Sequence, residues 1–375
     1  MDATATPAAV LTLDAPGLAP TVRPSDLLVR RPAGLYCPAG DFYIDPMRRV
    51  ERAVITHAHA DHARSGHAHY LAHHDSAGLL RQRLGRHISL QTLAYGEALD
   101  LHGVRLSLHP AGHVLGSAQI RLAHRGQVWV ASGDYFHAGH GQTNPTCAPF
   151  EAITCDCFIT EATFALPFYR WPDPHGEFEA LHAWWQRNAA DGQPSLLAAY
   201  SLGKAQRLLA GLEGSAGPIA VHPSVAELNT AYAQAGVRLP EVRRLDDCRP
   251  GELARALVIA PPSAAEHPAM RGYPTVRSAF ASGWMQLRAQ RRRPGLDQGF
   301  VLSDHADWPG LLQAIAATRC ERVIVMHGSE ATLVRYLRER GLDAGTLQPE
   351  GVPNAGLTPD APDAPSPAAA TAPPG

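Results

Sequence analysis

The chain has 375 residues, of which 45% are hydrophobic and 18% charged, and its formal net charge is −2 at pH 7. This length and apolar content predict a soluble globular protein with two domains, or with one domain and a large insertion. A near-neutral charge gives no general attraction to polyanions, so nucleic-acid binding would need a local basic groove. No run approaches the ~20 apolar residues of a membrane span, and the first residues lack the basic start of a signal peptide, so we expect a cytoplasmic protein.

Both ends of the chain, residues 1–22 and 354–375, are rich in Ala, Pro and Thr and are expected to be disordered tails. Between them, short β-rich runs that end in polar residues alternate with turn signals and helical patterns. This alternation predicts a layered α/β fold. The first predicted strand regions are 52–59, 104–113, 118–134 and 156–164, and the third of these is a hairpin that turns at Arg125-Gly126.

The pattern changes near residue 167, where a second α/β unit begins. Its predicted elements are a helix over 176–192, a strand, turn and helix over 195–212, strands over 217–222, 256–262 and 275–283, and a helix over 224–236. The chain then returns to a strand, a polar turn and a helix over 299–315, and does so again over 321–341.

Four histidines and an aspartate are concentrated in the stretch THAHADHARSGH, residues 56–67. His57 and His59 are two residues apart, so they fit an extended segment leaving a strand and cannot share one face of a helix. Asp61 and His62 follow where a helix could begin. Such a loop can surround two adjacent cations, with ligand types that suit zinc or manganese. The alternative is a polar loop in a histidine-rich protein. The further histidines, His67, His69, His73, His74 and His87, are expected on solvated helix surfaces.

Polar residues at the ends of other predicted strands are candidates to complete the ligand set. His113 lies between glycines that let the backbone approach a site closely, and Asp134 ends a strongly apolar strand. Asp45, in FYIDP, is a weaker candidate because Asp-Pro is also a turn signal. Each of these residues alone is more often structural.

Together with the histidine loop, this ordered set resembles the metallo-β-lactamase fold superfamily. Glu161 in ITEATF, His305 in SDHADW and His327 in VMHGSE look like the three further motifs of the β-CASP nucleases. The resemblance implies an αββα metallo-β-lactamase sandwich with an inserted α/β β-CASP cap domain. Residues 23–166 and 299–353 would form the two parts of the sandwich, and residues 167–298 would form the cap.

The resemblance also implies a ligand set for two divalent metal ions, Zn²⁺ or alternatively Mn²⁺. One ion would be held by His57, His59, His113 and Asp134, and the second by Asp61, His62, Asp134 and His327. Asp45 would orient the loop histidines through hydrogen bonds.

The resemblance implies that a hydroxide bridging the two metals attacks phosphorus. Asp61 would be a catalytic residue in this reaction as well as a metal ligand. His305 would give a proton to the departing sugar oxygen, and Glu161 would fix its tautomer and raise its pKa. Without the resemblance, His305 is equally well explained as a residue in a helix-capping loop.

The stretch YSLGKAQ, residues 200–206, has two explanations. Ser201, Gly203 and Lys204 could form a seat for a substrate phosphate, because a glycine turn opens a helix and lysine adds charge. An ordinary capped helix is the alternative.

More narrowly, THAHADHAR, AGHVLGSAQI, SGDY, ITEATF and SDHADW look like the bacterial ligase-associated DNA damage response exonucleases. The resemblance implies a nuclease that acts on DNA in repair, together with a DNA ligase and a helicase. RNA-processing β-CASP enzymes typically have histidine at the position that corresponds to His327. A ribonuclease that processes RNA ends is therefore the first alternative. A small-molecule metallo-hydrolase of the lactonase or thioesterase type is the second, and a non-catalytic scaffold is the third.

Overall fold

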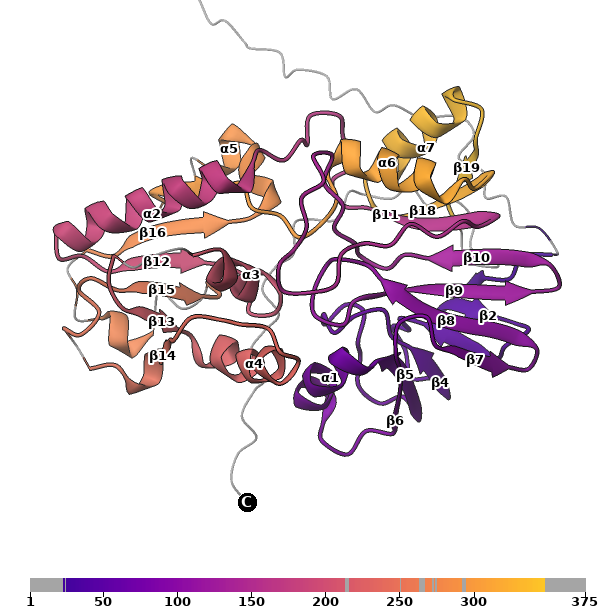
Figure 1. The fold of residues 1–375 in the computed structure, drawn as a ribbon, viewed down its shortest axis with the longest axis horizontal. Helices are drawn as coiled ribbons and strands as arrows, with labels where there is room; N and C mark the ends of the chain where they lie inside the picture. Colours follow the sequence, from indigo (N-terminus) through magenta and orange to yellow (C-terminus); the bar gives the residue numbers. More distant parts are fainter. Residues whose placement is uncertain are drawn as a thin grey trace, which may run out of the picture.

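The computed structural model describes residues 23, 25–212, 216–249, 251–262, 267–271, 273, 275–291 and 295–347. The predicted tails and the end of the predicted 299–353 segment lie outside the described residues. Three sheets organise the rest of the chain into two lobes (Figure 1). Two sheets lie face to face in one lobe, and the third forms the other.

The first sheet has six strands in sequence order and comes from the first quarter of the chain. It is antiparallel from its first to its third strand and parallel from its third to its sixth. Its strands are β1 (Val29–Arg31), β2 (Gly34–Cys37), β3 (Phe42–Ile44), β4 (Arg52–Val54), β5 (His69–His73) and β6 (Leu90–Leu93).

Two of the histidines expected on helix surfaces lie instead in this sheet. His69 and His73 belong to strand β5, and His67 and His73 are buried. The His73 ring stacks on Tyr95, with ring centroids 3.5 Å apart and planes inclined by 13°. Imidazole is apolar enough on its faces to pack in a strand, so a run of histidines does not by itself indicate a solvated helix.

The second sheet has seven strands in the order β19-β18-β11-β10-β9-β8-β7. Its strands are β7 (Ala98–Leu101), β8 (Val104–Pro110), β9 (Ala118–His124), β10 (Gln127–Ala131), β11 (Cys157–Ala162), β18 (Arg322–Gly328) and β19 (Asp343–Gly345). The predicted hairpin is confirmed: β9 and β10 pair antiparallel around Arg125 and Gly126, which have φ of 48° and 81°. Positive φ at both turn residues matches the right-handed twist of the strands.

The two sheets pack against each other through alternate residues of their strands. Phe42 and Val54 of the first sheet share an apolar cluster with Leu106 and Ile120 of the second. Because side chains alternate between the faces of a strand, the neighbouring residues, such as Ala53, point outward to the helices.

Helices cover both outer faces of this pair of sheets. On the first sheet, Leu79 and Leu80 of α1 (Ala77–Leu84) pack in the cluster that contains Ala53. On the second sheet, α6 (Trp308–Thr318) and α7 (Glu330–Glu339) cover Val323 and Val325 of β18. The lobe is therefore an α/β sandwich with the layers helix, sheet, sheet, helix.

The third sheet is parallel throughout, with the strand order β14-β13-β15-β12-β16-β17. Its strands are β12 (Ser195–Ala198), β13 (Ile219–Val221), β14 (Arg243–Arg244), β15 (Leu257–Ala260), β16 (Arg277–Ala281) and β17 (Gln298–Phe300). Its helices are α2 (Pro174–Ala190), α3 (Lys204–Gly211), α4 (Pro223–Gln234) and α5 (Arg288–Arg291). We call residues 174–300 the third-sheet lobe.

Strand β17 belongs to the third sheet, which differs from the prediction that the strand near residue 299 returns to the first unit. It pairs with β16. The apolar run at this point is compatible with either sheet, and only tertiary pairing decides between them.

The third-sheet lobe packs on the sandwich beside α1. Helix α4 lies next to α1 (Figure 1). Leu228 and Tyr232 of α4 share an apolar cluster with Leu79 and Leu80 of α1. Among the described residues, none of the helices is both long enough and apolar enough to cross a bilayer.

Candidate metal centre

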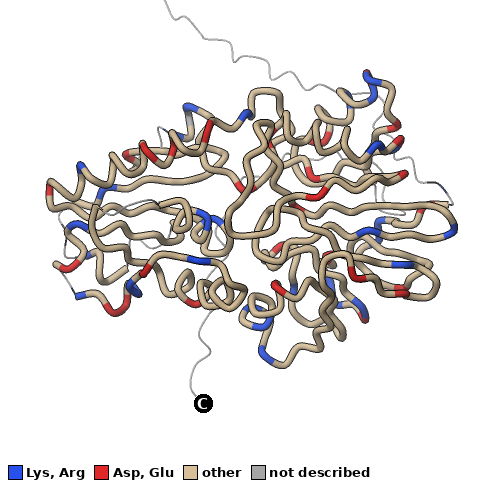
Figure 2. Tube along the Cα trace, viewed as in Figure 1, with Lys and Arg blue, Asp and Glu red and all other residues tan. Residues whose placement is uncertain are grey.

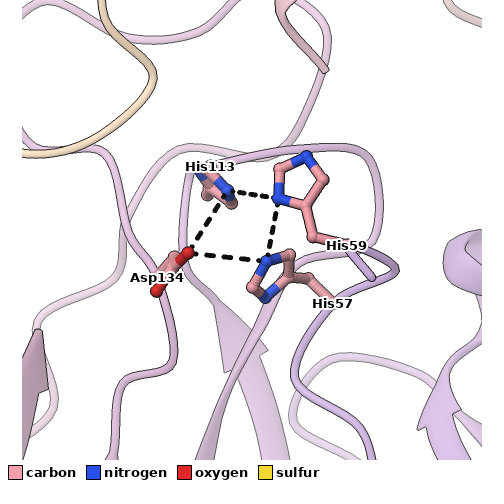
Figure 3. Close-up of side chains that lie close together, drawn as sticks. All are labelled: His57, His59, His113 and Asp134. Carbon is pink, nitrogen blue, oxygen red and sulfur yellow. Dashed lines mark hydrogen bonds and ion pairs between the residues drawn. The ribbon is translucent and has the colours of Figure 1, made fainter. Parts of the chain in front are cut away.

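Three histidines and one aspartate converge at one end of the sandwich (Figure 3). They come from the loops that follow β4, β8 and β10, so strands distant in sequence bring them together. His57 Nε2 lies 3.0 Å from His59 Nδ1, which lies 3.1 Å from His113 Nε2. One oxygen of Asp134, Oδ2, lies 3.6 Å from His57 Nε2 and 3.8 Å from His113 Nε2.

The far nitrogens of two of these rings are bound by backbone carbonyls. His59 Nε2 lies 3.1 Å from the oxygen of Leu202, and His113 Nδ1 lies 2.7 Å from the oxygen of Asp304. A carbonyl can only accept, so these ring nitrogens are the donors. In the neutral tautomers, the nitrogens that face each other therefore have no proton.

His57 is oriented through a chain of side chains that ends at Asp45. The Thr56 hydroxyl donates to Asp45 and lies 3.1 Å from His57 Nδ1, so that nitrogen donates to the hydroxyl. Asp45 also accepts from the Thr56 amide at 2.8 Å and lies 2.7 Å from His62 Nδ1. Asp45 thus contacts His62 directly and His57 through Thr56.

Burial keeps these imidazoles neutral. It lowers the pKa of His59, lowers that of His57 well below its usual value, and lowers that of His113 to about 3. Three unprotonated ring nitrogens and a carboxylate oxygen thus point at one another, which is unfavourable unless a cation lies between them. This donor set fits a divalent metal ion of the zinc type.

The second predicted ligand set is more open. His62 Nε2 lies 3.4 Å from Asp134 Oδ2 and 3.6 Å from Asp61 Oδ2, so Asp134 faces both sets. The Asp61 side chain is 69% exposed. His327, at the end of β18, is exposed, and its ring centroid lies 5.8 Å from that of His62. The four residues share one rim, but they do not form a group as tight as the first.

Electrostatics around His62 differ from those of the other loop histidines. Burial lowers its pKa, but Asp134 and Asp45 outweigh burial and raise the pKa well above its usual value. A cation at this position would replace that proton and satisfy the same two carboxylates.

The half-buried His305 and the buried Glu161 form a pair next to Asp134. His305 Nδ1 lies 2.9 Å from Glu161 Oε2, and Glu161 Oε1 accepts from the Tyr135 amide at 2.7 Å. Burial lowers the pKa of His305, but the Glu161 carboxylate outweighs burial and raises the pKa to about 10. The ligand atoms of His305 and Asp134 lie within 4.8 Å of each other, so one cation could contact both. The geometry of His305 therefore allows either proton donation or metal binding.

The predicted phosphate seat is not open to a ligand at Lys204. Lys204 is 1% exposed, and its ammonium donates to Asp304 Oδ1 at 2.6 Å and to the oxygen of Leu302 at 2.8 Å. Ser201 Oγ lies 2.8 Å from Ser224 Oγ, and a side chain at Gly203, where φ is 85°, would collide with Val114. Lys204 therefore lies in a buried joint between the lobes, which argues against a phosphate seat there and favours the alternative of an ordinary helix start.

The sequence analysis singles out Lys204 but does not predict its partners. Lys204 and Arg207 of α3 bind Asp304, Ser303 and Leu302, the segment whose carbonyl orients His113. Lys204 is the only lysine in the chain. Its partners lie about one hundred residues further along the chain, where no sequence pattern indicates a contact with α3.

No family model matches this chain. A relative named "Probable DNA ligase" from Opitutus terrae is 33% identical over 317 residues, which are 84% of this chain and 30% of that protein. An "Endoribonuclease ysh1" from Emericella nidulans is 31% identical over 125 residues, and an "Endoribonuclease YSH1" from Yarrowia lipolytica is 27% identical over 147. These segments cover 33% and 39% of this chain and 14% and 17% of the relatives.

The chain thus spans less than a third of the length of these curated relatives. Among solved structures, a protein of unknown function from Enterococcus faecalis V583 aligns with a TM-score of 0.52 at 13% identity, covering 80% of this chain and 79% of that one. This likeness concerns the fold alone. The chain is therefore an α/β sandwich protein with a second α/β lobe and with His/Asp groups that can hold metal.

Proposed function

We propose that this chain is a metal-dependent phosphodiesterase that degrades DNA as an exonuclease, on a metallo-β-lactamase sandwich with a β-CASP cap. The observation that carries the proposal is the convergence of three unprotonated imidazole nitrogens with Asp134 beside the His305–Glu161 pair. The cap would be residues 167–298, extended at its end to include β17.

In this proposal His57, His59, His113 and Asp134 hold one divalent ion. Asp61, His62 and His327 hold a second, with Asp134 shared. Zinc is the ion we propose, because imidazole nitrogens dominate the donor set, and manganese is the alternative. When bound, two such ions activate a water and neutralise charge on the phosphate.

His305 acts in this proposal as a proton donor. Glu161 accepts from His305 Nδ1 and is itself fixed by the Tyr135 amide. Nε2 is then the nitrogen left to give a proton to the departing sugar oxygen. The Glu161 carboxylate raises the pKa of His305 and so favours the protonated ring, which a general acid requires.

The choice of DNA is supported by the relative whose name is "Probable DNA ligase", since the match covers 84% of this chain. We propose that the chain acts in the cytoplasm in DNA repair, in concert with a DNA ligase and a helicase. A ribonuclease is the second candidate, which the partial matches to proteins named endoribonucleases favour.

The test is a comparison of end-labelled single-stranded DNA, duplex DNA and RNA of matched sequence, incubated with the metal-loaded protein. We expect stepwise shortening of DNA and slower cleavage of RNA. Preferred cleavage of RNA would select the second candidate. Hydrolysis of a panel of lactones and thioesters, with every oligonucleotide left intact, would overturn the proposal.

A further inference from the structure

A hollow of about 290 Å³ lies beside the histidine loop, on the sandwich lobe. Its wall includes Ala60 and Ala63, which bracket Asp61 and His62 in the loop. A space of this size holds roughly ten water molecules, so it can accept several groups of a ligand.

Four arginines line this hollow, and we call it the arginine pocket. They are Arg48 and Arg49, which follow β3, Arg64 of the histidine loop, and Arg83 of α1. Arg48, Arg49 and Arg64 are exposed, and none of the three guanidinium groups has an ion pair with any residue that the structure describes. No Asp or Glu is among the residues that line the pocket.

The pocket is coupled to the metal loop by direct contact. The Arg83 guanidinium donates to the carbonyl of Ala58, the residue between His57 and His59. Burial lowers the pKa of Arg83 and the nearby Asp61 carboxylate raises it, so the Asp61 side chain lies within electrostatic reach of the pocket. A ligand in the pocket would therefore lie directly beside the residues that hold the metals.

Arg48, Arg49 and Arg64 bring three positive charges without a described ion pair to one hollow, and these charges repel one another unless an anion joins them. The chain as a whole does not explain the cluster, because its net charge is −2 and acidic and basic residues are interspersed over both lobes (Figure 2). Arginine presents a planar fork of donors that matches the oxygens of a phosphate. The pocket has the composition of a phosphate-binding site.

We propose that the arginine pocket binds a backbone phosphate of the DNA strand, next to the phosphodiester that is cut at the metal centre. This inference rests on the proposed function and adds to it the site that holds the polymer. It also supplies the phosphate contact that the buried Lys204 does not provide. A small substrate that reaches only the metals does not need the pocket.

The experiment replaces the three exposed arginines together, as Arg48→Gln, Arg49→Gln and Arg64→Gln. On a single-stranded oligonucleotide, kcat/KM should fall by roughly tenfold or more, because each lost arginine removes a charge-assisted hydrogen bond. The slope of log kcat/KM against log salt concentration should flatten by about 2, the value expected for three lost phosphate contacts on a single strand. Hydrolysis of bis(p-nitrophenyl) phosphate and the metal content should stay unchanged.

The matched control removes one arginine each from β8, β9 and the β9–β10 turn, as Arg105→Gln, Arg121→Gln and Arg125→Gln. These residues are exposed or half-buried, have no ion pair with a described residue, and lie outside the β8–β9 loop that contains His113. The control should keep the oligonucleotide rate and its salt slope. The variant with Arg48→Lys, Arg49→Lys and Arg64→Lys should keep the salt slope but lose part of the rate on the oligonucleotide. Lysine keeps the positive charge but lacks the planar guanidinium donors of arginine.

If the glutamine variant and its control behave alike on the oligonucleotide, the pocket does not bind the strand and the inference fails, while the proposed function stands. If the unaltered protein cleaves bis(p-nitrophenyl) phosphate but no oligonucleotide, the proposed function fails first. Thermal unfolding of each variant confirms that these surface changes leave the fold intact.

Discussion

The tautomer of each imidazole near Asp134 is set by an acceptor on its far nitrogen. The acceptors are carbonyls for His59 and His113 and a hydroxyl for His57. The spacing of the histidines predicts that these residues are ligands, because imidazoles two apart on an extended segment can face one cation. The spacing could not predict the acceptors, which lie 143 residues from His59 and 191 residues from His113 along the chain.

A substitution at Asp45 measures how much these hydrogen-bond acceptors contribute to metal affinity. Asp45→Asn keeps the size of the side chain but removes the charge that fixes Thr56 and His62, so the affinity for zinc should fall by about 10–100-fold. Competition with a chromogenic chelator measures this affinity. Asp41→Asn is the control, since Asp41 also has positive φ but pairs at the surface with Arg52. Equal affinities for the two variants would contradict the role of Asp45.

A substitution at His305 distinguishes a role in proton donation from a role in metal binding. His305→Ala should keep both metals while kcat on DNA falls by about 10²–10⁴-fold, the usual effect of losing a positioned general acid. Hydrolysis of bis(p-nitrophenyl) phosphate should be largely spared, because its leaving group needs little protonation. His327→Ala should instead weaken one metal and slow both substrates. Loss of metal and equal losses on both substrates with His305→Ala would show that His305 is a ligand.

At the scale of elements, strand ends carry the candidate site. The loops after β4, β8 and β10 and the end of β18 all place proposed metal ligands at one end of the sandwich. The apolar runs of β8, β10 and β18 are long enough to predict the strands, and that of the three-residue β4 is continued by the buried Ile55 and Thr56. The three-residue strands β1, β3 and β19 are too short to show an alternation of apolar and polar residues. The histidines of β5 hide its strand pattern in the sequence. Their existence depends on pairing with neighbouring strands.

The buried ion pair of Lys204 and Asp304, at the start of α3, should contribute to the stability of the fold. Lys204→Met leaves the buried Asp304 carboxylate without its partner, so the free energy of unfolding should fall by about 3–5 kcal/mol, measured with urea. The double variant with Asp304→Asn should recover part of the loss. If unfolding is unchanged and only the affinity for DNA is lost, Lys204 is a phosphate ligand, as the sequence analysis predicts.

Because Lys204 is the only lysine, its reactivity reports on the same joint. An amine-acylating reagent should modify Lys204 only when the joint opens, because its ammonium is buried. The same protein unfolded in urea is the control, and its Lys204 should react much faster. Rapid acylation of Lys204 in the folded protein would contradict its burial.

At the scale of the molecule, the two lobes share the candidate centre. The sandwich supplies the proposed metal ligands, and the third-sheet lobe supplies the Leu202 carbonyl and Lys204, which hold His59 and the 302–305 segment in place. The change of pattern near residue 167 predicts a second unit. It could not predict that this unit touches the metal centre, because that contact arises only when the lobes dock.

We propose that these residues bind two divalent ions that are needed to cut DNA, and a metal titration measures both properties. The chelated protein is titrated with zinc or manganese, while bound metal and cleavage of an end-labelled single strand are measured together. We expect binding to saturate at two ions per chain, with cleavage appearing as the second site fills. Only trace metal after reconstitution, or full cleavage in the presence of chelator, would contradict it.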